Sequence, residues 1–229
     1  MCTPALSKNR LPEEFYLQPD VASIARQLLG KVLLTHINGT TTGGIITETE
    51  AYSGESDRAS HAFGGRRTQR TETLYQKGGI AYIYLCYGIH HLFNVVTHNE
   101  GFPHAVLIRA LHPLVGFETI ARRMDKDIQG PLLLNGPGKL SKALGITVAL
   151  NATPLSGNTI WISDHGCEVS DSKIKSGPRI GVDYAGSHAL WPMRFWVEDD
   201  AFLSNALKVT TAITGWQPKA EVGNTTHSI

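Results

Sequence analysis

Residues 45–109 decide the fold of this chain, and they read IITETEAYSGESDRASHAFGGRRTQRTETLYQKGGIAYIYLCYGIHHLFNVVTHNEGFPHAVLIR. Apolar, β-branched and aromatic runs flank a polar, glycine-rich segment, which is the pattern of strands joined by a long loop. Polar or charged side chains nevertheless interrupt the apolar runs: Glu48, Glu50, Asn94 and Arg109. Burying such groups is costly unless they pair or perform chemistry. With the neighbouring tyrosines, they could line a pocket that hydrolyses a bond beside a flat heterocycle.

The bulk composition is that of an ordinary folded protein. The chain has 229 residues, 41% hydrophobic and 18% charged, which suits one domain, or at most two small ones, with a full core. No stretch approaches the roughly 20 apolar residues of a membrane span, and the opening MCTPALSKNRLPEEF lacks the apolar segment of a secretory signal. The three cysteines are odd in number and widely spaced, so neither a disulfide framework nor a zinc knuckle is indicated. A reducing, cytoplasmic location follows.

The formal net charge of +1 lacks the basic excess of most nucleic-acid-binding domains. Its distribution is more informative than its sum, because Arg66, Arg67 and Arg70 cluster in a glycine-rich loop. These arginines are either solvated loop charges or a local patch for an anionic partner.

Turn signals divide the chain into elements. Asn38-Gly39 separates KVLLTHI from TTGGIITETEAY and is the strongest short hairpin signal. IAYIYLCY and HLFNVVT form a second strand pair around Gly88, and AVLIRAL, IWIS and MRFWV are further strands. Between the first two pairs, residues 53–73 are expected to form a long loop, and loops of that length are usually functional.

Helices are expected at the flanks of these strands. They cover residues 21–29 after the capping Asp20, residues 117–124, and LSKALG after a glycine-rich turn. The expected fold is therefore α+β: a single domain with a central, curved, mostly antiparallel sheet, flanking helices and a protruding hairpin. We expect this domain to span residues 1–207 and to be followed by a polar tail over residues 208–229.

Side chains alternate between the two faces of a strand, so Glu48, Glu50 and Tyr52 are expected on one face. A carboxylate beside a phenol ring suits a base that activates water near a stacked aromatic substrate. The alternative is a solvated face of an edge strand. Arg109, inside VLIRAL, requires a carboxylate partner if it is buried, and Glu50 is the natural candidate, in either an architectural or a catalytic pair. Asn94, inside LFNVV, either fixes a turn or contacts a ligand.

Ten histidines are enough to raise the question of a metal site, but their spacing does not favour one. None belongs to an HExxH pair, and the adjacent His90 and His91 would point to opposite faces of a strand. We expect no metal and no cofactor. GGRR and GPGK match neither common phosphate-loop motif, although backbone N–H groups where Lys139 enters its helix could hold a phosphate.

Taken together, the motifs carry a resemblance to a known family. TETEAY, SHAFGGRRTQR, YIYLCYG, FNVV, VLIRAL, NGPGKL and WPMRFWV occur in the order and approximate spacing of the alkyladenine (3-methylpurine) DNA glycosylases. The resemblance covers residues 17–197. It implies one α/β domain with a hairpin that enters the DNA minor groove. It also implies an enzyme that flips a damaged purine into a pocket and cleaves its N-glycosidic bond with water, without a metal. The implied partner is duplex DNA with a damaged purine, bound by a monomer at the nucleoid if the source is bacterial, or in the nucleus if it is eukaryotic.

The resemblance also implies roles for individual residues. Glu50 resembles the general base that holds the attacking water, and Arg109 the residue that helps to position it. Tyr52 and Tyr84 resemble the rings that sandwich the flipped base, with His61 at its edge or face. Tyr87 resembles the wedge at the hairpin tip, and Asn94 the amide that crowds the exocyclic amine of guanine. The implied contacts to the DNA are Arg66, Lys139, Arg194 and Leu74, the last standing where methionine is common beside the wedge.

Two other classes of protein compete with this interpretation. A non-catalytic RNA- or tRNA-binding module of similar fold would keep the basic loop but would not need Glu50 and Arg109 buried together. A metal-dependent nucleoside hydrolase would need metal ligands, which a metal analysis of the purified protein can detect.

Overall fold

The structure is a computed structural model that describes residues 9–126 and 134–197. The expected domain boundary at residue 207 and the expected tail lie outside the described residues. The helices are α2 (Glu13–Tyr16), α3 (Val21–Gln27), α4 (Phe117–Met124) and α5 (Pro137–Leu144). The strands are β1 (Val32–Ile37), β2 (Thr40–Tyr52), β3 (Ala81–Cys86), β4 (His90–Thr97), β5 (His104–Val115), β6 (Leu134–Asn135), β7 (Ile160–Ser163), β8 (Ile174–Gly177) and β9 (Arg194–Val197).

These strands form one curled sheet, and every described pairing within it is antiparallel. The main order is β3-β4-β5-β2-β1-β7, with β6 added to β5 and β9 joining β2 to β8. The long strand β2 is therefore central. It pairs with β5 along one side, and with β1 and then β9 along the other. The α+β class and the mostly antiparallel sheet expected from the sequence are confirmed.

Turn chemistry fixes both hairpins. Asn38 and Gly39 take the left-handed backbone conformation, with φ of 53° and 75°, as a tight turn matched to the twist of the flanking strands requires. The β3–β4 turn repeats this device with Tyr87 and Gly88, at φ of 51° and 73°. Cys86 faces His90 across that turn, so the hairpin end carries the tyrosine at its tip.

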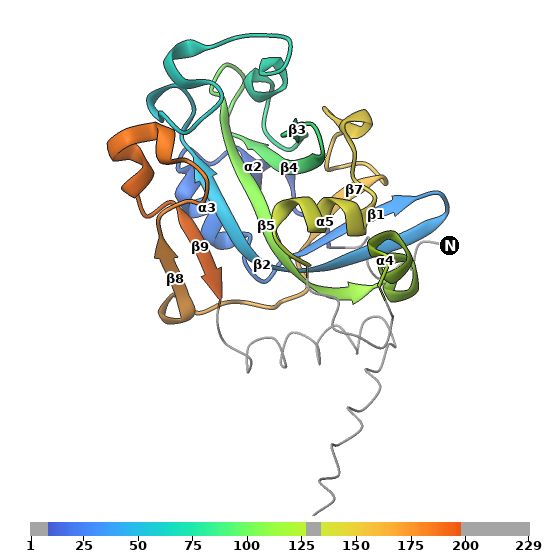
Figure 1. The fold of residues 1–229 in the computed structure, drawn as a ribbon. Coiled ribbons are helices and arrows are strands. Elements are labelled where there is room, and N and C mark those ends of the chain that lie inside the picture. The colour runs from blue at the N-terminus through green and yellow to red at the C-terminus, as the bar shows by residue number, and fades with distance from the viewer. Residues whose placement is uncertain (1–8, 127–133, 198–229) are drawn as a thin grey trace, which may run out of the picture.

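Helices cover both faces of the sheet (Figure 1), with α5 in front of β5 and α3 behind β2. Asp20 caps α3, because its side chain accepts a hydrogen bond of 3.0 Å from the Ala22 N–H. Gly145 ends α5 in the left-handed conformation. Buried residues of both helices belong to one apolar cluster with the sheet. No helix in the described part of the chain is long and apolar enough to cross a membrane.

The structure differs from the sequence expectations in local detail. The expected loop over residues 53–73 contains the 3₁₀ turns Gly54–Ser56 and Phe63–Gly65, and its end runs into a third, Glu72–Tyr75. The short elements α2, β6 and β8, and the 3₁₀ helix Asp183–Leu190, were not expected. The elements α2, β6 and β8 carry too few residues for a hydrophobic period, and Gly186, at φ of 60°, interrupts the 3₁₀ helix.

Candidate active site

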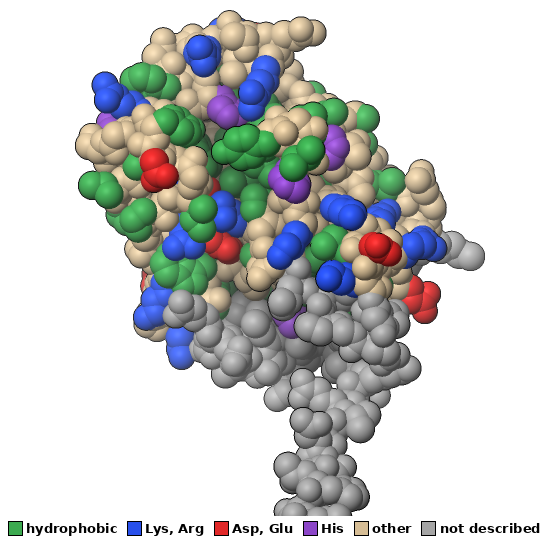
Figure 2. Space-filling model, viewed as in Figure 1, with side chains coloured by type: hydrophobic (Ala, Val, Ile, Leu, Met, Phe, Trp, Pro, Cys, Tyr) green, Lys and Arg blue, Asp and Glu red, His purple; other side chains and the backbone are tan. Residues whose placement is uncertain are grey.

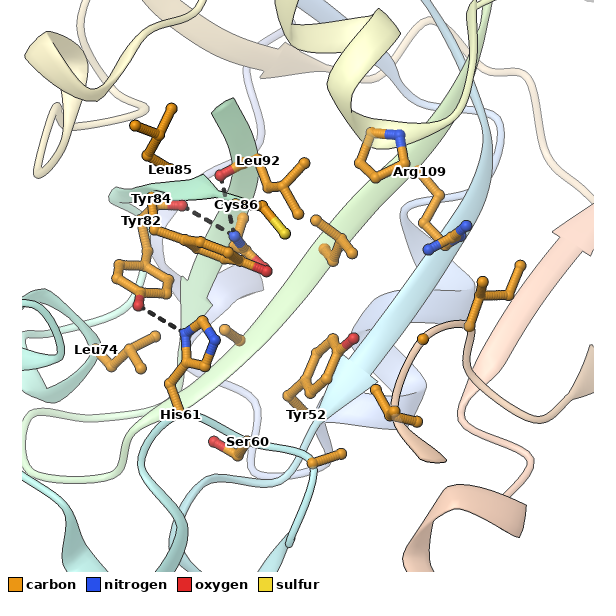
Figure 3. A pocket seen from close by; sticks show the side chains of 18 of the residues that line it. Tyr52, Ser60, His61, Leu74, Tyr82, Tyr84, Leu85, Cys86, Leu92 and Arg109 are labelled. Atoms are coloured by element: carbon orange, nitrogen blue, oxygen red, sulfur yellow. Dashed lines mark hydrogen bonds between the residues drawn. The ribbon is translucent and has the colours of Figure 1, made fainter. Parts of the chain in front are cut away.

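A cavity of about 440 Å³ opens where β2, β3, β4 and β5 meet the 53–73 loop and residues 180–184. Aromatic and apolar side chains line most of it, and Figure 3 shows Tyr52, His61 and Tyr84 around the same space as Arg109. The lining includes most of the residues selected from the sequence: Tyr52, His61, Leu74, Tyr84, Tyr87, Asn94 and Arg109. The fold thus gathers residues that lie far apart in the sequence around one space.

Glu50 does not line the cavity itself: it is completely buried and contacts Tyr52, Arg109 and Ile180, which do line it. Its Oε1 accepts a hydrogen bond of 2.8 Å from the Ile180 backbone N–H and lies 3.2 Å from Nη1 of Arg109. Its Oε2 accepts a hydrogen bond of 2.8 Å from the Tyr52 hydroxyl. Since β2 is flanked on both sides by other strands, the alternative of a solvated edge strand does not hold. A carboxylate offers about four lone-pair sites, and these three donors occupy three of them, which leaves one site on Oε2.

The electrostatics favour a basic carboxylate. Burial raises the pKa of Glu50, and Arg109, the Ile180 N–H and the Tyr52 hydroxyl oppose that rise. A carboxylate with a raised pKa accepts a proton from water more readily than an ordinary glutamate. Burial and the neighbouring Glu50 carboxylate also raise the pKa of Tyr52 well above its usual range, so Tyr52 stays a hydrogen-bond donor.

Arg109 joins the two glutamates. Its Nε donates to Oε1 of Glu48 at 3.1 Å, while Nη1 faces Glu50. Glu48 also accepts a hydrogen bond of 3.1 Å from Nη1 of Arg194. Shifts in the β2–β5 register on both sides of Glu48 allow both carboxylates to reach one guanidinium, as local bulges in strands can. The expected pair of Glu50 with Arg109 is therefore part of a larger network.

Aromatic rings form the opposite wall of the cavity. The rings of His61 and Tyr84 meet edge to face, with centroids 4.5 Å apart, and Tyr82 lies 5.5 Å from Tyr84. The guanidinium of Arg70 lies over the Tyr84 ring, 4.9 Å from its centroid. On the side of Glu50, the Tyr52 ring lines the same cavity. A cavity with aromatic rings on both sides suits a flat heterocycle, because offset and edge-to-face ring contacts are favourable.

His61 is neutral at physiological pH. Burial, and then the guanidinium groups of Arg70 and Arg66, lower the pKa of His61 to about 4. Arg70 can only donate, so its 3.4 Å contact with Nε2 of His61 makes that nitrogen the acceptor. Nδ1 then carries the proton and donates to the Tyr82 hydroxyl at 2.9 Å.

Asn94 is buried on β4, with 4% of its surface exposed. Its Nδ2 donates to the backbone carbonyls of Tyr82 at 3.1 Å and Leu92 at 3.3 Å, the two bonds drawn in Figure 3. Both N–H groups of the amide are therefore used by the hairpin backbone. The side chain is fixed in one orientation, and its oxygen is the atom left for a ligand.

The hairpin tip presents apolar side chains to solvent. Tyr87 is 90% exposed and Ile89 71% exposed. Exposure of two such side chains at one turn marks an interaction surface. Ile89 was not selected from the sequence, although it follows the turn glycine directly.

Of the four residues expected to contact DNA, two are exposed and two are not. Arg66 and Lys139 are exposed, and Lys139 donates to the Asn135 amide oxygen at 3.1 Å. Arg194 is occupied by Glu48 and by the Pro178 carbonyl. Leu74 is 3% exposed and packs with Tyr75, Tyr82 and other apolar residues under the cavity. This placement does not agree with a DNA contact for Leu74, because a buried side chain cannot reach a duplex; Leu74 belongs to the cavity wall.

Two features of the site were missed from the sequence. Ile180 contributes a backbone N–H, which no side-chain pattern can indicate, although the GPRIG motif around it includes Gly181 at φ of 75°. Tyr184 also lines the cavity and donates to the Ala59 carbonyl at 3.1 Å. It comes from the 3₁₀ helix that no periodicity predicts.

Figure 2 shows the face of the molecule that carries the hollow. Hydrophobic side chains gather in it and lysine and arginine side chains surround it, with few acidic ones. Such a ring of positive charge suits a polyanion. Among the residues that the structure describes, no group of three or more histidine, cysteine, aspartate or glutamate side chains could hold a metal ion.

Fold and cavity together define a protein that can hold a flat base between aromatic rings, beside a buried carboxylate and under a cationic rim. Comparison with known proteins gives a match to one family. Residues 14–201 match the family described as methylpurine-DNA glycosylase (MPG). The chain therefore belongs to the methylpurine-DNA glycosylase family, which confirms the family and the class of enzyme expected from the sequence.

Similar proteins occur in several bacteria, and each is named "Putative 3-methyladenine DNA glycosylase". One from Chlamydia abortus is 49% identical over 186 residues, which cover 81% of this chain and 96% of the relative. One from Bacillus cereus is 45% identical over 201 residues, with coverage of 84% and 98%. One from Desulfitobacterium hafniense is 42% identical over 203 residues, with coverage of 86% and 98%.

Proposed function

We propose that this protein is a monofunctional DNA glycosylase that flips alkylated or deaminated purines out of duplex DNA and hydrolyses their N-glycosidic bond. The proposed substrates are 3-methyladenine, 7-methylguanine, hypoxanthine and ethenoadenine, and the reaction would begin base excision repair. The protein would act as a monomer on chromosomal DNA. The observation that carries the proposal is the buried Glu50 carboxylate, held by Ile180, Tyr52 and Arg109 beside an aromatic cavity.

Flipping is required because a base inside a duplex is inaccessible, and extrusion costs a few kcal/mol. Stacking between Tyr52, Tyr84 and His61 would offset this cost. Tyr87 would fill the gap left in the duplex, as apolar wedges do in the minor groove. Arg66 and Lys139 would contact the phosphate backbone, whereas Arg194 would act mainly through Glu48.

In the chemical step, water attacks C1′ of the deoxyribose while the bond from C1′ to the purine nitrogen breaks. The base leaves with the bonding electron pair, and Glu50 takes the proton of the water. The same carboxylate stabilises the positive charge that develops on the sugar. Arg109 keeps Glu50 oriented and sets its protonation state. Cationic alkylpurines leave readily, whereas neutral hypoxanthine needs a hydrogen bond or a proton at N7.

Release of free bases tests this proposal. The full chain should liberate 3-methyladenine and 7-methylguanine from duplex DNA treated with a methylating agent, as measured by chromatography of the soluble fraction. Methylated DNA that keeps all of its modified bases would overturn the proposal.

Excision should need neither a metal nor a covalent enzyme intermediate. No described residue lining the cavity is a lysine, so no amine is placed there to attack C1′. We expect full activity in EDTA and no protein–DNA adduct after borohydride treatment. Activity that is lost in EDTA and restored by zinc or magnesium would instead favour a metal-dependent hydrolase.

Asn94 should limit attack on undamaged guanine. Guanine greatly outnumbers lesions, and its 2-amino group would be crowded sterically by an amide that two backbone carbonyls hold in place and that cannot turn away. Such discrimination is worth on the order of 1–3 kcal/mol, or about 5- to 150-fold. Asn94→Ser or Asn94→Ala should therefore raise the single-turnover rate of guanine release relative to hypoxanthine release in matched duplexes. An unchanged ratio would make Asn94 a purely structural residue.

A further inference from the structure

A buried ion pair adjoins the proposed catalytic carboxylate and has no part in the mechanism above. The side chains of Asp57 and Arg179 are both completely buried. Nη1 of Arg179 bonds to Oδ2 of Asp57, and Nη2 donates to Oδ1 at 2.9 Å. This two-pronged geometry fixes the orientation of a guanidinium far better than a single contact does.

Arg179 connects three segments of the chain. Besides Asp57, in the 53–73 loop, it donates from Nη1 to the Ala51 carbonyl at 2.8 Å and from Nη2 to the His188 carbonyl at 3.2 Å. Ala51 lies on β2 between Glu50 and Tyr52. The guanidinium is therefore anchored to the backbone that carries the proposed base and the proposed stacking ring.

Arg179 and its neighbour Ile180 also contact the side chains of Tyr52 and Glu50. The guanidinium carbon of Arg179 lies 4.8 Å from the centroid of the Tyr52 ring. Tyr52 lines the cavity and Arg179 does not, so the cation supports the ring from outside the cavity. The next residue, Ile180, gives its backbone N–H to Oε1 of Glu50 at 2.8 Å. One rigid unit therefore touches Tyr52 directly and Glu50 through a peptide group.

Stability alone does not account for this arrangement. The Nε of Arg179 is buried and has no hydrogen-bond partner among the residues that the structure describes, which carries a desolvation cost. Buried ion pairs can often be replaced by apolar residues with no loss of stability. What an apolar pair would not supply is a fixed direction for the Ile180 N–H and a cation against the Tyr52 ring.

We propose that Arg179 and Asp57 are positioning residues: their ion pair holds the Ile180 N–H against Glu50 and supports Tyr52 under the flipped base. This inference rests on the proposed function, in which Glu50 is the base.

The inference predicts a specific electrostatic consequence. The Ile180 N–H is one of the groups that lower the pKa of Glu50, so its displacement should raise that pKa. The other charged and titratable groups that act on Glu50 are Tyr52, Arg179 itself, Arg109, Glu48 and Tyr184. The last three are on different supports and should remain in place, and a variant that keeps the charge of Arg179 leaves that charge beside Glu50. A purely structural ion pair would leave the Glu50 pKa unchanged when it is weakened.

The test uses Arg179→Lys, which keeps the charge but cannot form the two-pronged contact, and Asp57→Asn as a second variant. Glu50 is titrated in the free, full-length protein by carbon-13 NMR of its carboxyl group, assigned by the signal that Glu50→Gln removes. Single-turnover excision of hypoxanthine and lesion-duplex affinity are then measured. Arg123→Lys is the matched control, because Arg123 also donates to a backbone carbonyl, that of Ala143 at 2.9 Å, but does not line the cavity.

We expect Arg179→Lys, which keeps the charge, to raise the Glu50 pKa, and both test variants to lower the excision rate about 10- to 100-fold, with little change in affinity. Arg123→Lys should lower the melting temperature without either effect. Test variants that lose stability but keep the wild-type Glu50 pKa and excision rate would overturn the inference. A wild-type protein that releases no base would overturn the proposed function instead, while the titration still decides whether Arg179 controls Glu50.

Discussion

Glu50→Gln should abolish base release while leaving the fold and lesion binding largely intact. The variant keeps the volume of the side chain but removes the group that takes the proton of the water and faces the developing charge on the sugar. General-base catalysis alone contributes roughly 10²- to 10⁴-fold, and loss of the negative charge should add to that. The excision rate of the variant should therefore fall by a factor at or beyond the upper end of this range.

The surroundings of Glu50 explain why the variant should fold. A glutamine can turn its carbonyl oxygen toward the Ile180 N–H and Arg109, which both face Oε1 in the wild type. Its NH₂ group then meets the Tyr52 hydroxyl, which can accept a hydrogen bond as well as donate one. Single-turnover excision and equilibrium binding are measured on the same lesion duplex, with the exposed Glu118→Gln as the control. Near-normal excision by Glu50→Gln would mean that another group activates the water.

Tyr87→Ala should produce the second large effect, and it should depend on the substrate. Tyr87 is 90% exposed and sits in the left-handed backbone conformation at φ of 51°. That conformation costs roughly 1–2 kcal/mol for a residue with a side chain. A large ring held there without packing partners is consistent with a wedge for duplex DNA.

Removal of the ring should weaken binding to lesion duplexes and slow multiple-turnover excision on them. Excision from single-stranded DNA should change much less, because there is little stacking to disrupt. The measurement is the ratio of the two losses for the same lesion and flanking sequence. Equal losses on duplex and single-stranded substrates would argue that Tyr87 supports the fold rather than the opened duplex.

Much of the fold could be predicted from the sequence because its signals are local. Asn38-Gly39 and Gly88 mark the two hairpins, and the helix over residues 117–124 was predicted with its observed bounds. Alternation along β2 placed Glu50 and Tyr52 on one face, and the structure joins them by a hydrogen bond.

The rest depended on contacts between distant segments. Burial of Leu74 depends on packing with Tyr82 and other residues from separate elements, so the sequence could suggest a DNA contact that the fold does not present. The bond from the Ile180 N–H to Glu50 spans 130 positions and involves a backbone group, which has no sequence signal. Arg179 was not selected from the sequence, because only the folded chain brings Asp57 and Tyr52 to it.

Excision from duplexes with one defined lesion tests the central claim most directly. The full-length protein, in excess, is incubated with duplexes that each carry a single hypoxanthine, ethenoadenine or 7-methylguanine, and each strand is then resolved with and without alkali. If Glu50-activated water cuts the glycosidic bond, wild-type protein will leave an abasic site, so the strand will break at the lesion only after alkali, and Glu50→Gln will give no break. Lesion strands that stay intact after alkali for every lesion, with wild-type protein in excess, would contradict the account.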